Sequence, residues 1–102
     1  MLIIKGLVEK IREEAHDVKK YAEAAVRTRM DDPQLADLYA DLGAEEMKHA
    51  ERLHKAAVDV INRYTSSGKE APAVMRAIWD FEHQIMIEEM ADAKRLLETV
   101  RS

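Results

Sequence analysis

A glutamate and a histidine three residues apart, Glu46 and His49, stand where the apolar stripe of a long helix should continue. Residues at this spacing project from one face of a helix, so the carboxylate and the imidazole can reach the same metal ion. Glu14 holds an equivalent position in the preceding helical segment. A carboxylate at a core position needs a partner or a cation. The sequence therefore predicts a metal site made by Glu14, Glu46 and His49.

Three segments with helical periodicity must position these residues. The expected helices cover about residues 5–29, 33–65 and 71–100. In the first two, residues of the predicted inner face alternate at spacings of four and three. These residues are Leu7, Ile11, Glu14, Val18, Tyr21, Ala25 and Thr28, then Leu35, Tyr39, Leu42, Glu46, His49, Leu53, Ala56 and Val60. We expect an all-α protein with a single domain over residues 1–102.

Two short connections separate the expected helices. Asp32 is a favourable N-cap, and Pro33 suits the first helical position, where no intrahelical N–H partner is needed. Gly68 and Pro72 mark the second connection. Short connections favour antiparallel neighbours, so the predicted architecture is an antiparallel helical hairpin followed by a third helix.

Composition limits the partners that the chain can bind. It has 102 residues, a formal net charge of −4 and no cysteine. Basic residues are mixed with acidic ones throughout, so nucleic acid is not an expected partner. Any metal must be bound by Glu, Asp or His. The opening MLII is too short for a signal peptide or a membrane span, so we expect a cytoplasmic protein with no membrane partner.

The segments REEAHDVKKYAEAA and LADLYADLGAEEMKHAERLHKAA resemble the first two helices of the ferritin-like superfamily, in its rubrerythrin-like and encapsulated-ferritin-like branches. That superfamily builds a di-iron carboxylate site from one Glu on each of two helices and Glu-x-x-His on each of two others. The resemblance covers about residues 7–60 and half of that ligand set. It implies that Glu14, Glu46 and His49 are iron ligands and catalytic residues, with manganese or zinc as competitors for the same site.

The third expected helix contains no second Glu-x-x-His, so one chain cannot complete such a site. Two copies supply four carboxylates and two imidazoles, and the resemblance thus implies a homodimer that forms a ferritin-like four-helix bundle. Encapsulated ferritins complete their centre across a subunit interface, often form larger rings and are enclosed by a protein shell. A ring-like oligomer and an encapsulating shell are therefore expected partners, although no recognisable shell-targeting segment follows Leu97.

The function implied by the resemblance is a ferroxidase that oxidises Fe(II) to Fe(III) in iron storage or detoxification. Two alternatives stay open. One is a rubrerythrin-like peroxidase, which the absence of a Cys-rich electron-transfer module disfavours. The other is a non-catalytic helical dimerisation module, in which the Glu and His residues form a buried polar network that fixes the register.

Several further residues have two interpretations each. Glu82 in the third helix is either a secondary metal ligand or the partner of a Lys or Arg on a neighbouring helix. Tyr21 and Tyr39, about two turns from the ligands, are either hydrogen-bond donors to them or ordinary core residues. Gly43 marks either a close helix contact or a harmless surface position.

The histidines outside the motif are expected to be solvated or structural. His16 and His54 flank the stripes and are predicted to face solvent, while His83 lies at an edge of the third helix. Trp79 is expected to contribute to packing or to an interface rather than to a cofactor site.

Overall fold

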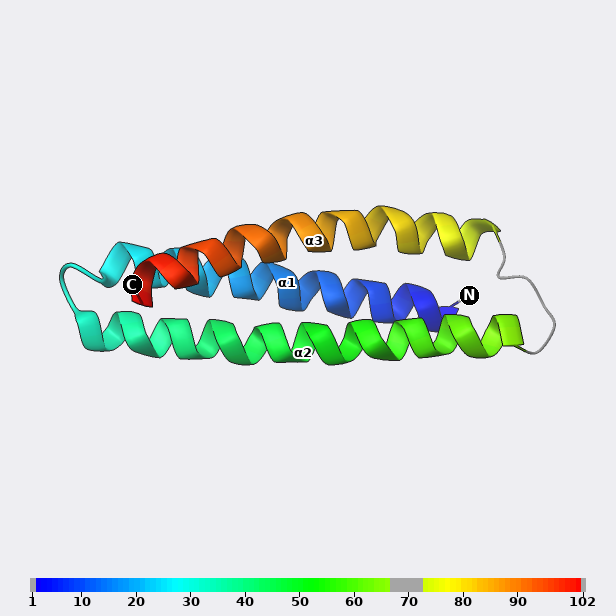
Figure 1. The fold of residues 1–102 in the computed structure, drawn as a ribbon, viewed down its shortest axis with the longest axis horizontal. Coiled ribbons are helices and arrows are strands. Elements are labelled where there is room, and N and C mark those ends of the chain that lie inside the picture. The colour runs from blue at the N-terminus through cyan, green and yellow to red at the C-terminus, as the bar shows by residue number, and fades with distance from the viewer. Residues whose placement is uncertain (1, 67–72, 102) are drawn as a thin grey trace.

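The structure, a computed structural model, describes residues 2–66 and 73–101, and over these residues it contains three helices and no strand (Figure 1). Helix α1 spans Leu2–Thr28, α2 spans Pro33–Ser66 and α3 spans Ala73–Arg101. The molecule is elongated, at 56 × 20 × 18 Å. The predicted all-α class is confirmed. Gly68 and Pro72, expected in the second connection, lie outside the described residues.

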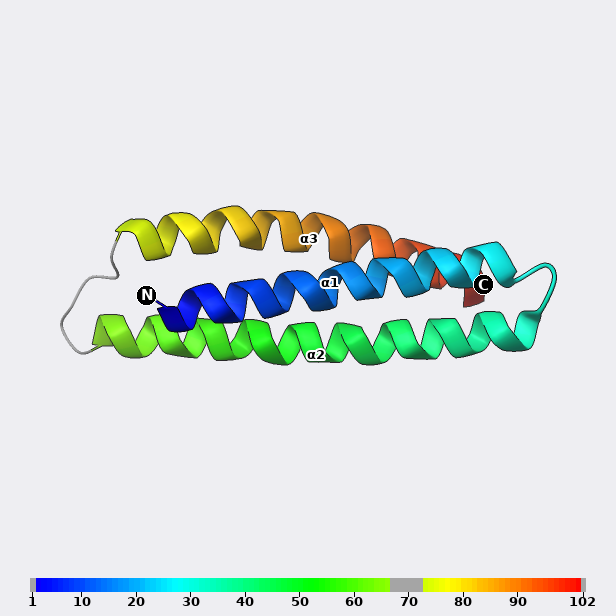
Figure 2. The same cartoon turned by 180° about the vertical axis from the view of Figure 1, so that it is seen from behind.

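Helix α1 lies between the other two helices (Figures 1 and 2). It packs extensively against both α2 and α3, whereas α2 and α3 meet at few places. Helix α2 runs antiparallel to α1, and α3 runs in the same direction as α1 (Figure 1). The structure therefore has the predicted hairpin plus a third helix, and α3 covers one side of that hairpin.

The first helix begins at Leu2, three residues earlier than the sequence pattern indicated. Ile4 is fully buried, and it belongs to an apolar cluster with Val8, Ile11, Ala57 and Met75. This cluster joins all three helices near the start of α1. Burial of Ile4 therefore accounts for the earlier helix start, since a fixed helical backbone is needed to hold its side chain in the cluster.

The turn between α1 and α2 has the capping chemistry that the sequence predicted. The backbone N–H of Leu35 donates a hydrogen bond to Asp32 Oδ1 at 3.1 Å, and Pro33 is the first residue of α2. The N–H of Ala36 donates to the carbonyl oxygen of Asp32 at 3.0 Å. Asp32 thus satisfies a backbone donor that the helix itself leaves without a partner.

The fully buried residues of α2 form a line along the helix, and each of them follows a residue of the predicted inner face by one position. Its members are all small: Ala36, Ala40, Gly43, Ala50 and Ala57. The predicted line is half-buried instead, at Leu35, Tyr39, Leu42, Leu53, Ala56 and Val60. On α1, Ile11, Val18 and Ala25 are buried as expected, but Leu7, Glu14, Tyr21 and Thr28 are half-buried. The reason is that small side chains allow the closest approach of two helices, which leaves the larger side chains at the flank of the contact.

Gly43 marks the close helix contact that was one of its two predicted interpretations. A Cβ atom placed on it would lie 3.3 Å from Tyr21 Cβ and 3.5 Å from Leu97 Cδ2. Gly43 is therefore buried between α1 and α3. The absence of a side chain there lets α1 and α2 come together one helical turn before Glu46.

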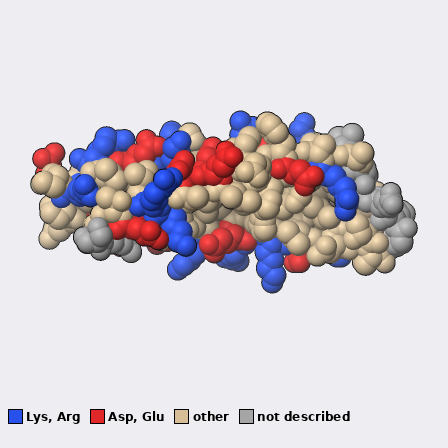
Figure 3. All heavy atoms as spheres, turned by 45° about the horizontal axis from the view of Figure 1, so that its top comes forward, with Lys and Arg blue, Asp and Glu red and all other residues tan. Residues whose placement is uncertain are grey.

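Acidic and basic side chains are interspersed over the face of the molecule drawn in Figure 3. This mixture agrees with the charge pattern of the sequence, in which no run of basic residues stands apart from acidic ones. Among the described residues, none of the helices has both the length and the apolar composition needed to cross a bilayer.

Candidate metal centre

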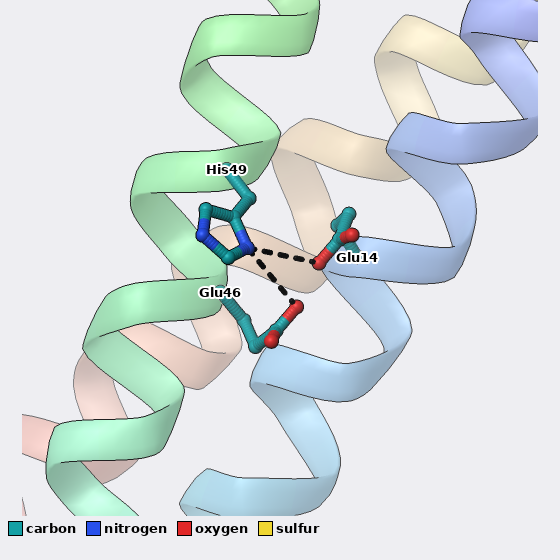
Figure 4. A group of neighbouring side chains, drawn as sticks. All are labelled: Glu14, Glu46 and His49. Atoms are coloured by element: carbon teal, nitrogen blue, oxygen red, sulfur yellow. Dashed lines mark ion pairs between the residues drawn. The ribbon is translucent and has the colours of Figure 1, made fainter.

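Glu14, Glu46 and His49 meet in the groove between α1 and α2 (Figure 4). His49 Nδ1 lies 3.7 Å from Glu14 Oε2 and 3.7 Å from Glu46 Oε2. One ligand atom from each residue lies within 4.8 Å of the others. In Figure 4, α3 passes behind the three side chains, on the other side of the groove. The structure thus brings together all three residues that the sequence indicated as metal ligands.

The local positions of the three side chains follow from the helices that carry them. Glu46 and His49 are one turn apart on α2, so they project from the same face. Glu14 comes from α1 and points toward them across the groove (Figure 4). The close approach at Gly43 brings α1 and α2 near enough for side chains of modest length to meet.

The three residues are less buried than the sequence pattern indicated. The exposed fraction of the side chain is 23% for Glu14, 24% for Glu46 and 52% for His49. No polar or charged residue described in the structure is fully buried. The expectation of core positions is therefore wrong for a single chain. The physical reason is that α3 packs on the other side of α1 and leaves this groove open.

One atom of the group is nevertheless cut off from water. Glu14 Oε2 is buried and has no hydrogen-bond partner. A buried carboxylate oxygen without a partner costs free energy, and a cation bound in the groove would remove that cost. The orphaned atom is the one that lies 3.7 Å from His49 Nδ1.

The donor set, and the spacing of its two pairs that include His49, fit a divalent first-row metal. Oxygen or nitrogen ligands at about 2.1 Å from one ion lie roughly 3–4 Å from one another. The two separations of 3.7 Å fall in that range. Carboxylates supply negative charge, and a neutral imidazole supplies a softer donor, a combination that suits iron, manganese and zinc.

Glu82 lies elsewhere, at the contact between α1 and α3. Its Oε1 is 3.6 Å from Arg12 Nη1, so it forms the ion pair with a neighbouring helix that was one of its two interpretations. Glu82 is not a member of the group formed by Glu14, Glu46 and His49. Its Oε2 is buried without a hydrogen-bond partner, as is Glu14 Oε2.

Tyr21 and Tyr39 pack against each other. Their ring centroids are 6.4 Å apart and the rings are tilted by 32°, a usual geometry for an aromatic pair. Both are half-buried, and Tyr21 Cβ faces Gly43. Their role as hydrogen-bond donors to the metal ligands stays a prediction.

Sequence reasoning missed a second cluster, formed by His54 on α2 with Trp79 and His83 on α3. The ring centroids are 5.2 Å apart for His54 and Trp79, 5.0 Å for His54 and His83, and 5.0 Å for Trp79 and His83. His54 was expected to face solvent, but it is half-buried against Trp79 and His83 of α3. It follows Ala50 by four residues and precedes Ala57 by three, and this position on the buried line was the signal for it. His16 is exposed, as expected.

The environment of His54 changes its acidity. Burial, and then the charge of His83, lower the pKa of His54 from its ordinary value of 6.5. Both effects disfavour the positively charged form of His54. His54 is therefore a neutral imidazole near pH 7.

A search for known relatives of the chain, by family models, by curated proteins and by solved structures, found no match.

Proposed function

We propose that this protein is a ferroxidase whose di-iron site is shared between two copies of the chain in a ferritin-like four-helix bundle. The main support for the proposal is the convergence of Glu14, Glu46 and His49. One carboxylate oxygen of this group, Glu14 Oε2, is buried without a hydrogen-bond partner. These residue types in this arrangement form half of the ligand set of a di-iron carboxylate centre. The role in iron storage or detoxification follows from the same chemistry.

The face that carries the group is suited to pairing with a second copy. Half-buried apolar side chains continue along both helices on either side of the metal ligands. Leu7, Ala56 and Val60 line an open groove between α1 and α2 farther along the molecule. A second copy placed on this face would cover these side chains and bring three more ligands to the centre. Helix α3 does not obstruct this face, because it packs on the opposite side of α1.

In the proposed reaction, Fe(II) is the substrate. Glu14 and Glu46 supply negative charge that stabilises the more highly charged Fe(III) product, and His49 is a terminal ligand. Each Fe(II) gives up one electron. The two electrons from a pair of ions, with two protons, reduce one dioxygen to hydrogen peroxide, or reduce one hydrogen peroxide to two water molecules. The three side chains leave coordination positions for the oxidant, and manganese or zinc can compete for them.

The larger assembly is part of the proposal through the resemblance alone. A ring of dimers and an enclosing protein shell would separate the oxidised product from solvent. Neither is needed for the oxidation itself, so the catalytic step can be tested on the isolated protein.

The decisive experiment is an anaerobic Fe(II) titration of the purified apo-protein, with bound iron and sedimentation followed together, before air is admitted. We expect about two irons per dimer, a dimer or larger assembly strengthened by iron, and rapid Fe(III) absorbance on aeration. Replacement of dioxygen by peroxide in the same assay separates ferroxidase from peroxidase activity.

Glu46→Gln tests the ligand role, and Glu45→Gln is the matched control because Glu45 is exposed and adjacent. We expect Glu46→Gln to lose iron oxidation and Glu45→Gln to retain it. If the wild-type protein binds no iron and its oligomeric state does not respond to the metal, the ferroxidase proposal is wrong. The group would then be a polar network of a helical dimerisation module.

A further inference from the structure

The contact between α2 and α3 contains two imidazoles that the proposed function does not use. His54 on α2 and His83 on α3 have ring centroids 5.0 Å apart, with an angle of 29° between the rings. Both are half-buried, so each ring retains contact with solvent. Trp79 lies beside both of them, at 5.2 Å from His54 and 5.0 Å from His83.

The separation of the two rings matches a metal-bound pair. An imidazole nitrogen binds zinc at about 2.0–2.1 Å, which places the ring centroid about 3.2 Å from the ion. Two such rings around a tetrahedral ion therefore have centroids about 5 Å apart. The χ2 torsion is broad for histidine, so each ring has rotational freedom to present a nitrogen to an ion.

We propose that His54 and His83 form a two-imidazole site for a late divalent transition metal, represented by Zn²⁺ and Cu²⁺, which links α2 to α3. This site is separate from the group formed by Glu14, Glu46 and His49, and it does not depend on the ferroxidase proposal. Water completes the coordination shell, since only two protein ligands are present.

The protonation state of His54 favours metal binding. Only a neutral imidazole has a free lone pair for a metal ion. The lowered pKa of His54, caused first by burial, favours its neutral ring near pH 7. No proton therefore has to leave His54 when an ion binds at that pH.

An open groove between α2 and α3 reaches Trp79 of the cluster. It is lined by Val58, Ile61 and Asn62 of α2 and by Arg76, Trp79 and Asp80 of α3. Asp80 precedes His83 by three residues and thus projects from a similar face of α3.

The two sites should differ in the metals that they prefer. Imidazole pairs favour copper and zinc, whereas a set with two carboxylates also accommodates iron and manganese. Bound at His54 and His83, an ion would join two helices that otherwise meet at few places. Metal binding to the folded state alone would stabilise that contact.

The chain contains one tryptophan, Trp79, so its fluorescence reports directly on this cluster. We expect Cu²⁺ to quench Trp79 fluorescence in a saturable manner. His54→Gln and His83→Gln should each lose that saturable quenching, whereas His16→Gln and His49→Gln should retain it. Quenching that persists in the first two variants, or that is lost only in His49→Gln, would overturn the proposal.

A second measurement needs no substitution and so does not depend on the folding of a variant. Zn²⁺ is added to ¹⁵N-labelled wild-type protein, and the ring signals of the histidines are followed by NMR. We expect the His54 and His83 signals to change together and to saturate near one equivalent. If these two signals stay fixed while Zn²⁺ changes only the signal of His49, the two-imidazole site does not exist.

Discussion

Helix α2 takes part in two side-chain clusters that differ in composition and in surroundings. On its outer flank, Glu46 and His49 face Glu14 of α1 and form an oxygen-rich group in an open groove. On its inner side, His54 contacts the rings of Trp79 and His83 of α3 and forms a group with nitrogen donors only. His54 follows His49 by only five positions on one helix, yet the two clusters contact different helices.

The difference shows how a three-helix arrangement divides the faces of a helix. The small buried side chains of α2 form its close contact with the other helices. The larger residues beside them either pack against α3 or lie at the open flank. Charged residues at the flank remain partly hydrated and are accessible to a cation or to a second copy of the chain. Aromatic residues on the inner line are instead held by packing, which changes the pKa of His54.

The largest expected effect comes from Glu14→Gln, which should separate the two clusters functionally. Since the loss of residues that merely support metal ligands costs about 10–100-fold in affinity or activity, we expect iron oxidation to fall by more than about 100-fold. Quenching of Trp79 by Cu²⁺ should stay unchanged. The control is Glu13→Gln, an exposed neighbour outside the group. Parallel loss of both signals would mean that the two clusters are not independent.

Gly43→Leu should affect the hairpin itself, because a side chain there meets Tyr21 and Leu97. Overpacking of this kind costs about 1–3 kcal/mol of unfolding free energy, measurable by urea denaturation. We also expect weaker iron binding, since α1 and α2 must separate near Glu46. Gly6→Leu is the matched control, because nothing lies within 4 Å of a Cβ at Gly6. Equal destabilisation by both substitutions would contradict the close contact at Gly43.

A smaller effect is expected from pH, and it should arise at the α2–α3 cluster. The pKa of His54 is lower in the folded protein than its ordinary value of 6.5, so below about pH 6.5 the unfolded chain binds a proton that the folded chain resists. The free energy of unfolding should therefore decrease as the pH falls from 6.5 toward the pKa that His54 has in the folded protein. Above pH 6.5, this loss of stability should be absent.

Thermal denaturation with a chelator present, at pH 7.5 and at pH 5.5, measures this effect. His54→Gln should show a smaller loss of Tm between the two pH values than the wild type. His16→Gln replaces an exposed histidine and should behave like the wild type. An identical pH response in His54→Gln and the wild type would contradict the assignment.

The smallest effect is expected from Glu82→Gln. Arg12 is 65% exposed, so its ion pair with Glu82 is largely hydrated and contributes about 0–1 kcal/mol. Iron oxidation should persist, since Glu82 lies outside the metal group. Glu9→Gln on α1 replaces another exposed acid and serves as the comparison. A loss of iron oxidation specific to Glu82→Gln would place this residue in the centre after all.

The sequence predicted the helices and the shared face of Glu46 and His49 because both depend on local spacing. Helical periodicity places Glu46 and His49 on one face without knowledge of any neighbour. The capping of α2 by Asp32 is equally local. These features could be predicted from short segments alone.

The choice between two adjacent lines of α2 could not be made in this way. Alanine is a weak signal of burial. The sequence pattern therefore favours the adjacent line of leucines over the line that contains Ala36 and Ala50. Which line is buried depends on where α3 packs, and that is a property of the whole chain. The stacking of His54 was missed for the same reason.

The turn at residues 29–32 has a kinetic consequence. It joins α1 and α2 through few residues, so the loss of loop entropy on pairing the two helices is small. Contacts that close short loops form early in folding, and we therefore expect the α1–α2 hairpin to assemble ahead of the docking of α3. All three residues of the oxygen-rich group belong to that hairpin. A nascent chain would accordingly have Glu14, Glu46 and His49 in place before α3 docks.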